Sequence, residues 1–196
     1  MSAQNGEEVD VAEVDVARER FEALFQLHVA GIASYCRWCL RSRGDAEDAV
    51  AEVFLIAWRR LDDVPAGEAA RPWLYATARR VVANQARGDA RRGKLNEKLN
   101  SQPVAIEQSE EEPLAGQVHE ALAALAPRDS ELLFLAECEG FTATEIGRIM
   151  HRPPVTVRVR LHRAKRRFRA AFDARTPATD TTVPRPVSTL PKRVEP

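Results

Sequence analysis

The stretch Phe141–Phe172, FTATEIGRIMHRPPVTVRVRLHRAKRRFRAAF, contains a short helical pattern, a break and a long basic helical pattern. Thr142 and Glu145 have the spacing of a capping box, in which each side chain binds the other residue's backbone N–H, so a helix is expected to start there. The segment His151–Pro154 then ends it, because proline lacks the N–H that a helix interior needs but is tolerated in a first helical turn. The second helix is expected to begin at this proline pair, which completes a helix-turn-helix pattern.

The second helix of this stretch is predicted to have one apolar face and one basic face. Apolar residues recur at steps of four and three residues, which gathers them on one side for burial: Val157, Leu161, Ala164, Phe168 and Ala171. The opposite side and its flanks carry Thr156, Arg158, Val159, His162, Arg163 and Arg166. No Asp or Glu occurs between Arg148 and Arg169. A helix surface with positive charges alone is more typical of one that contacts phosphates than of an ordinary solvated surface.

Composition indicates a globular chain that stays out of the membrane. The 196 residues are 44% hydrophobic and 30% charged, which is enough for one or two domains. No apolar run approaches the roughly 20 residues that cross a bilayer. The amino terminus is acidic, unlike a secretion signal. We therefore expect a cytoplasmic protein with no membrane insertion.

The three cysteines suggest a reducing compartment, because their number is odd and no secretion signal precedes them. Cys36 and Cys39 form a C-x-x-C that could bind zinc or cycle as a dithiol, but the second ligand pair of a zinc site is missing. Free cysteines are commonly small buried apolar side chains, which is the interpretation we favour. We therefore expect no metal and no cofactor. A redox role would require a thiol of lowered pKa.

The order of patterns predicts an all-α chain with two small helical domains joined by a flexible linker, the second domain carrying the helix-turn-helix. Acidic or proline-rich segments without apolar periodicity are expected to be disordered. The predicted segments are an acidic disordered amino terminus at 1–17, a first helical domain at 18–92, an acidic linker at 93–113, a second domain at 114–175 and a disordered Pro/Thr-rich tail at 176–196.

Within the first domain, Asp45 is expected to cap a helix whose buried stripe consists of Ala49, Val50, Val53, Ala57 and Leu61. Glu52, Leu55 and Arg59 lie off that stripe, either as ordinary surface or as a partner-binding face. A later helix, expected from Trp73 to about Arg92, has a basic side rich in amides. Amides can read base edges, and aromatic rings can stack on unpaired bases or simply fill the core.

Three motifs together resemble an extracytoplasmic-function sigma factor of bacterial RNA polymerase. They are DAEDAVAEVFLIAWRRL (Asp45–Leu61), RPWLYATARRVVANQARGDARR (Arg71–Arg92) and the block Ala121–Phe172. The resemblance extends from Arg18 to Phe172 in the family's order. It implies a protein that binds core RNA polymerase, recognises the minus-thirty-five and minus-ten promoter elements and promotes DNA opening. Core polymerase and promoter DNA are the partners it implies, and an anti-sigma factor is a further candidate.

The resemblance also implies roles for residues by their position. The polymerase clamp would be contacted by Asp48, Glu52, Leu55 and Arg59. The opened minus-ten strand would be contacted by Trp73, Arg80, Asn84, Arg87, Arg91 and Arg92. The minus-thirty-five duplex would be contacted by Thr156, Arg158, Val159, His162, Arg163 and Arg166, with Arg167 nearer the phosphates. The family usually has other residues at His151, Arg152, Arg80 and Val159, so the base sequences read at the two elements do not carry over.

Two other classes of protein remain as alternatives. One is a zinc or redox protein that uses Cys36 and Cys39, which would show stoichiometric metal or a thiol of lowered pKa. The other is a helix-turn-helix regulator that does not bind core polymerase, which would explain the last domain but would leave the Asp45 and Arg71 helices without a role. Co-purification with core polymerase separates this regulator from a sigma factor. An enzyme is not expected, because the sequence has no Ser/His/Asp set, no phosphate-binding glycine loop and no paired metal carboxylates.

Overall fold

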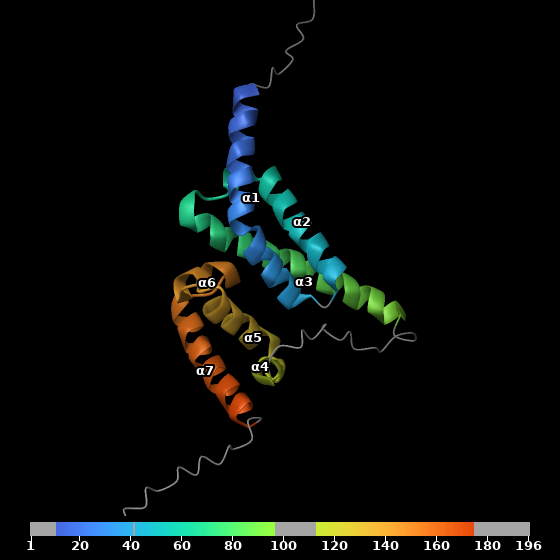
Figure 1. The fold of residues 1–196 in the computed structure, drawn as a ribbon, viewed down its shortest axis with the longest axis vertical. Coiled ribbons are helices and arrows are strands. Elements are labelled where there is room, and N and C mark those ends of the chain that lie inside the picture. The colour runs from blue at the N-terminus through green and yellow to red at the C-terminus, as the bar shows by residue number, and fades with distance from the viewer. Residues whose placement is uncertain (1–10, 41, 97–112, 175–196) are drawn as a thin grey trace, which may run out of the picture.

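The computed structural model describes residues 11–40, 42–96 and 113–174, and within these ranges the fold is all-α, as predicted (Figure 1). Predictions for residues 1–10, for most of the linker and for the tail lie outside the described residues. The elements are α1 (Val11–Cys39), α2 (Arg43–Arg59), the short helices η1 (Leu61–Asp63) and η2 (Gly67–Ala69), α3 (Ala70–Asn96), α4 (Pro113–Ala123), α5 (Pro127–Leu133), the π-helix η3 (Phe134–Cys138), α6 (Ala143–Met150) and α7 (Pro154–Asp173).

Helices α1, α2 and α3 pack together as the first helical domain. The expected stripe of α2 is buried at Ala49, Val53 and Ala57. The predicted cap is wrong: Ser42, in extended backbone, accepts a hydrogen bond from the Asp45 N–H at 3.3 Å, so α2 begins at Arg43. Two helices also run past the expected domain limits. Helix α1 already begins at Val11, within the segment expected to be disordered, and α3 continues to Asn96.

The helix-turn-helix forms as predicted in the second domain. The Glu145 N–H donates to Thr142 Oγ1 at 3.3 Å, and the Thr142 N–H donates to Glu145 Oε2 at 2.7 Å, which is the expected capping box. His151 ends α6 in the left-handed conformation with φ 52°, and α7 begins at Pro154. Gly147 keeps this turn tight, because a Cβ there would lie 2.7 Å from the Arg152 carbonyl oxygen.

Helix α7 packs against α4, α5 and α6 through the predicted apolar face. Val157 and Ala164 are buried, and Leu161, Phe168 and Ala171 are half-buried. The long basic helix is thus anchored along one side only, which leaves its opposite side in solvent.

The two domains lie against one another, with α6 beside α3 (Figure 1). One continuous apolar cluster joins α1 and α3 to α5, η3 and α6. Aromatic rings form much of this contact between the domains. Tyr75 packs edge-on against Phe141 with ring centroids 4.8 Å apart, and Trp38 stacks on Phe134 with ring centroids 4.8 Å apart. The expected pair of linked domains is therefore observed in a closed arrangement, in which the start of α3 is covered by the helix-turn-helix.

Candidate nucleic-acid interface

The solvent side of α7 brings the predicted minus-thirty-five residues together. All are exposed except Thr156, which is half-buried: Arg158, Val159, His162, Arg163 and Arg166. Within the part of the chain that the structure describes, the guanidinium groups of Arg158, Arg163 and Arg166 form no ion pair. This side of the helix therefore presents cations that no carboxylate of the described residues neutralises.

Other cations of α7 are paired with the domain's own acids. Lys165 Nζ lies 2.8 Å from Glu137 Oε1, and Arg167 forms an ion pair with Asp129. The Asp129 side chain is only 14% exposed, so it holds Arg167 against α5. Arg167, expected nearer the phosphates, is thus already engaged within the domain. The sequence offered no local sign of this, since the two partners are 38 residues apart.

The minus-ten residues of α3 fall into two groups. Asn84 and Arg87 are exposed and hydrogen-bonded to one another. Trp73 is half-buried against the core, and Arg80 is exposed. The side chains of Arg91 and Arg92 lie outside the described residues.

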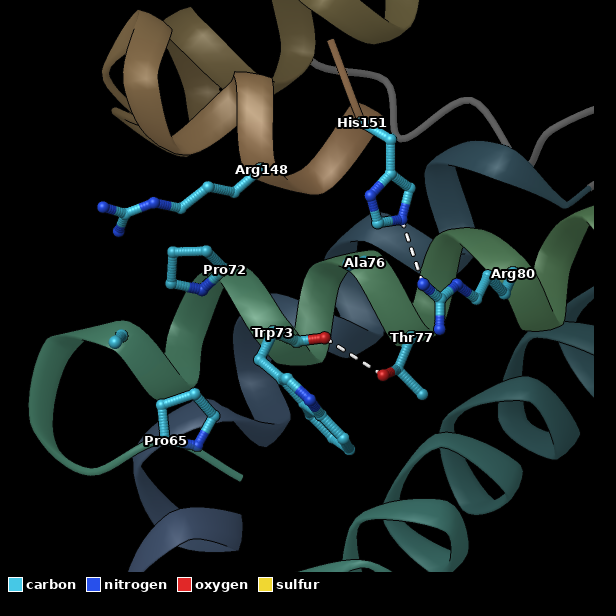
Figure 2. Close-up of a pocket in the computed structure, with 9 residues that line it drawn as sticks. Pro65, Pro72, Trp73, Ala76, Thr77, Arg80, Arg148 and His151 are labelled. Carbon is cyan, nitrogen blue, oxygen red and sulfur yellow. Dashed lines mark hydrogen bonds between the residues drawn. The ribbon is translucent and has the colours of Figure 1, made fainter. Parts of the chain in front are cut away.

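A cavity of about 460 Å³ separates the start of α3 from the helix-turn-helix (Figure 2). Pro72, Trp73 and Arg80 line it from α3, and Arg148 and His151 line it from the other domain. Arg80 Nη2 lies 3.0 Å from His151 Nε2 across this space. One predicted strand-binding residue is therefore in contact with the turn that positions the recognition helix.

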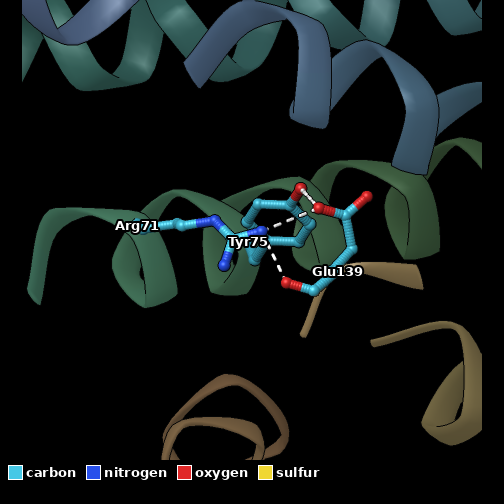
Figure 3. A network of polar contacts seen from close by, with 3 residues as sticks. All are labelled: Arg71, Tyr75 and Glu139. Carbon is cyan, nitrogen blue, oxygen red and sulfur yellow. Dashed lines mark hydrogen bonds and ion pairs between the residues drawn. The ribbon is translucent and has the colours of Figure 1, made fainter. Parts of the chain in front are cut away.

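Glu139 provides a polar junction between the domains (Figure 3). Arg71 Nη2 donates to Glu139 Oε2 at 2.9 Å and to the Glu139 carbonyl at 2.8 Å, and the Tyr75 hydroxyl donates to the same carboxylate. The Arg71 guanidinium also lies 4.1 Å from the Phe141 ring centroid, within cation–π range. Burial, together with the hydrogen bond to Glu139, raises the pKa of Tyr75. Gly31 leaves space for the Tyr75 hydroxyl, because a Cβ at this position would lie only 2.6 Å from it.

The π-helix η3 explains how Glu139 reaches α3. The Glu139 N–H bonds to the Phe134 carbonyl at 3.1 Å, one residue further back than in an α-helix. Gly140 then takes φ 69° and ends the turn. This wide turn places Glu139 at the domain boundary, which helical periodicity in the sequence does not reveal.

Glu131 provides a second polar junction. Its Oε1 accepts hydrogen bonds from the Tyr35 hydroxyl at 2.8 Å and from Arg79 Nε at 2.8 Å. Its side chain is only 13% exposed, so the carboxylate depends on these donors. Glu131 and Glu139 together link the second domain to both α1 and α3.

Cys36 and Cys39 lie within this packed region, whereas Cys138 is exposed. Burial raises the pKa of Cys36 to about 11 and that of Cys39 to about 12. This direction is the opposite of what a reactive thiol needs. Among the described residues, no group of three or more His, Cys, Asp or Glu side chains is placed to hold a metal ion.

The predicted polymerase-facing residues share the outer side of α2. Asp48, Glu52 and Arg59 are exposed, and Leu55 is 46% exposed. An aromatic group adjoins them: Trp58 is 42% exposed and contacts Phe21 with ring centroids 5.1 Å apart. Sequence reasoning missed Trp58, because a large aromatic residue directly after the buried Ala57 gave no sign that it faces solvent.

Comparison with known families decides what these surfaces belong to. Residues 24–92 match Sigma-70 region 2, and residues 115–168 match Sigma-70, region 4. The two matches together span more than half of the chain, in the order that the motifs predict. The chain belongs to the sigma-70 family. The prediction of a sigma factor of RNA polymerase, with region 2 before region 4, is confirmed.

Solved structures share the fold of this sigma factor. The sigma factor RpoE from Bartonella quintana, in complex with the anti-sigma factor NepR, is 22% identical with a TM-score of 0.67, over 79% of this chain and 98% of that one. CnrH, in complex with the cytosolic domain of CnrY, is 22% identical with a TM-score of 0.59, over 82% and 96%. The PhyRSL–NepR complex from Sphingomonas sp. Fr1 is 18% identical with a TM-score of 0.59, over 80% and 92%.

Family membership carries the general function. Sigma factors bind core RNA polymerase and recognise promoter DNA, and they are non-enzymatic transcription initiation factors. The alternative, a helix-turn-helix regulator that does not bind polymerase, would not explain the match of residues 24–92 to region 2. In the described ranges, no helix is long and apolar enough to cross a membrane.

Proposed function

We propose that three surfaces of this sigma factor have separate roles in transcription initiation. The solvent side of α7 reads the minus-thirty-five duplex, α3 captures the opened minus-ten strand, and the outer side of α2 binds the polymerase clamp. The domains would correspond to residues 18–92 and 114–175, with residues 93–113 as the linker between them. The chain would act in the cytoplasm and catalyse no reaction of its own.

The observation that carries this proposal is the separation of charge on α7. Lys165 and Arg167 are held by carboxylates of the same domain, whereas Arg158, Arg163 and Arg166 have no such partner among the residues that the structure describes. Cations left free on one side of an anchored helix can neutralise phosphates and release counterions. Arginine is also suited to bidentate contact with guanine in the major groove.

Strand capture by α3 is supported by Asn84 and Arg87, which are exposed beyond the domain junction. An amide and a guanidinium can bind the edges and phosphates of unpaired bases. Trp73 and Arg80 instead face the cavity under α6. Their use in strand binding therefore requires α6 to move away from α3. Arg91 and Arg92 complete the proposed set by their position after Arg87 in the sequence.

Clamp binding by α2 is supported by an exposed apolar residue among charges. Leu55 has Glu52 and Arg59 as neighbours on the same side of the helix, and Asp48 precedes them by one turn. An amphipathic surface of this kind suits a partner that supplies a groove with a charged rim.

An anti-sigma factor is a candidate regulatory partner. RpoE and CnrH, whose folds this chain shares, were solved bound to NepR and to the cytosolic domain of CnrY respectively. We extend that kind of partner to this chain as part of the proposal.

Transcription by core polymerase plus this protein, on a randomised promoter library, tests the proposal. We expect transcripts from templates that share two spaced elements. Arg163→Ala should change the preference at the upstream element only, and Asn84→Ala should reduce yield without changing that element. A protein that binds duplex DNA yet supports no transcription would return the chain to the regulator alternative.

A further inference from the structure

Two exposed valines stand out on the recognition helix α7. Val155 is 62% exposed and Val159 is 46% exposed. They are the only exposed large hydrophobic side chains among residues 117–118 and 120–174, the part of the second domain whose side chains the structure describes. The other large apolar side chains described in this domain are buried wholly or in part, so this pair calls for a specific explanation.

The two valines lie opposite the buried side of the helix. Val157, which is 1% exposed, is two residues from each of them. Two residues correspond to about 200° of rotation in an α-helix, so both side chains point away from the core. Both also belong to the first two turns of α7, which starts at Pro154. The amino-terminal residues of a recognition helix are those that reach base edges.

The surroundings of the pair favour DNA as its contact. Arg158, His162 and Arg163 are exposed beside the valines, and the only acid in α7 is Asp173 at its far end. A protein partner for this side would have to be strongly acidic and apolar at once. Duplex DNA supplies both features, since phosphates border the groove and the thymine C5-methyl is an apolar group on its floor.

We propose that Val155 and Val159 select promoter sequence by packing against thymine methyl groups in the upstream element. This inference rests on the proposed role of α7 and adds the bases that it prefers. Four residues rise about 6 Å along a helix. That is close to two steps of about 3.4 Å along one DNA strand. The two valines should therefore contact thymines one or two base pairs apart.

Deoxyuridine tests the contact directly, because it pairs like thymidine but lacks the methyl group. The full chain is first used to select duplexes from a randomised library, and each thymine of the selected site is then replaced singly by deoxyuridine. Loss of one buried methyl contact should weaken binding about fourfold at one or two positions. Val159→Ala should bind the parent site more weakly and no longer respond at its own position, while Val155→Ala should lose the response at the other.

The controls separate this inference from the proposed function. Leu27→Ala, at a residue 76% exposed on α1, should leave every response unchanged. Val159→Thr keeps one methyl and the branched shape, so it should retain part of the response. Selected sites without thymine, or mutants that keep the full deoxyuridine response, would overturn the methyl contact while duplex binding stood. Absence of sequence-selective duplex binding by the parent chain would instead overturn the role of α7 itself.

Discussion

Arg71 of the first domain and Glu139 of the second form an ion pair at the domain junction, with Nη2 and Oε2 2.9 Å apart. The Glu139 side chain is 10% exposed, and the Tyr75 hydroxyl shares its carboxylate. A buried carboxylate with these donors depends on the closed arrangement. The same arrangement covers Trp73 and engages Arg80, so the closed chain does not offer the whole of the surface that we propose for the minus-ten strand.

Glu139→Gln should therefore loosen the junction. Removing the charge weakens hydrogen bonds that are worth roughly 1 to 3 kcal/mol when one partner is ionised. Small-angle scattering of the full chain should show a larger radius of gyration. Glu137→Gln is the matched control, because it removes the same charge two residues away but disturbs only the exposed pair with Lys165. Identical scattering profiles for the two variants would contradict a holding role for Glu139.

The capping box gives the second prediction, which concerns pH. Hydrogen bonds from the Thr142 side chain and backbone lower the pKa of Glu145 below the ordinary value of a glutamate, 4.5. A lowered folded-state pKa contributes stability above the unfolded pKa, and this contribution is lost as pH falls through the folded value. The melting temperature of Glu145→Ala should thus lie below the parent's at neutral pH, with a difference that shrinks below pH 4.5. Thermal melts at several pH values measure this, and a constant difference would count against it.

Local patterns in the sequence were enough to predict the main helices and the capping box of α6, although the cap of α2 was predicted at Asp45 and lies at Ser42. The Thr142–Glu145 spacing and the turn at His151 depend on neighbouring residues, so they can be recognised in the chain itself. The contacts of Glu131 and Glu139 could not be predicted from the sequence, because their partners lie 52 to 96 residues away. Nor does helical spacing reveal a π-helix, which turns Glu139 towards α3. The candidate residues were therefore predictable as surfaces, but their mutual contact across the domains was not.

The third prediction concerns α2. Leu55→Asp should weaken binding to core polymerase and leave the melting temperature unchanged, because Leu55 is 46% exposed and off the buried stripe. Val14→Asp is a control of similar exposure, 44%, in the first turn of α1. Pull-down with core polymerase and thermal melting of each variant measure the two effects. A lower melting temperature for Leu55→Asp would show that the residue serves packing instead.

The fourth prediction separates arginines on one helix. Arg163→Ala should weaken duplex binding by about 1 to 3 kcal/mol and relax the preference at one base pair. Arg166→Ala should weaken all sequences alike and reduce the salt slope by about one. Arg167→Ala should change the salt slope little, because Asp129 already neutralises that guanidinium. Titrations of matched and unmatched duplex at several salt concentrations measure this. Equal slopes for the Arg166 and Arg167 variants would show that the ion pair does not set the charge available to DNA.

The last prediction tests whether α3 binds opened strand. Asn84 is exposed on α3, so unpaired bases can reach it, although its Oδ1 accepts a hydrogen bond from Arg87. Asn84→Ala should leave binding to the minus-thirty-five duplex unchanged yet reduce formation of the open promoter complex, because unstacked bases are the expected ligand. Permanganate footprinting with core polymerase measures opening. Gln26→Ala removes an exposed amide from α1 and should open the promoter like the parent. On a template with a pre-melted bubble, the defect of Asn84→Ala should be smaller, because the strands are already unpaired. Equal opening by mutant and parent on the closed promoter would show that this part of α3 is an ordinary basic surface.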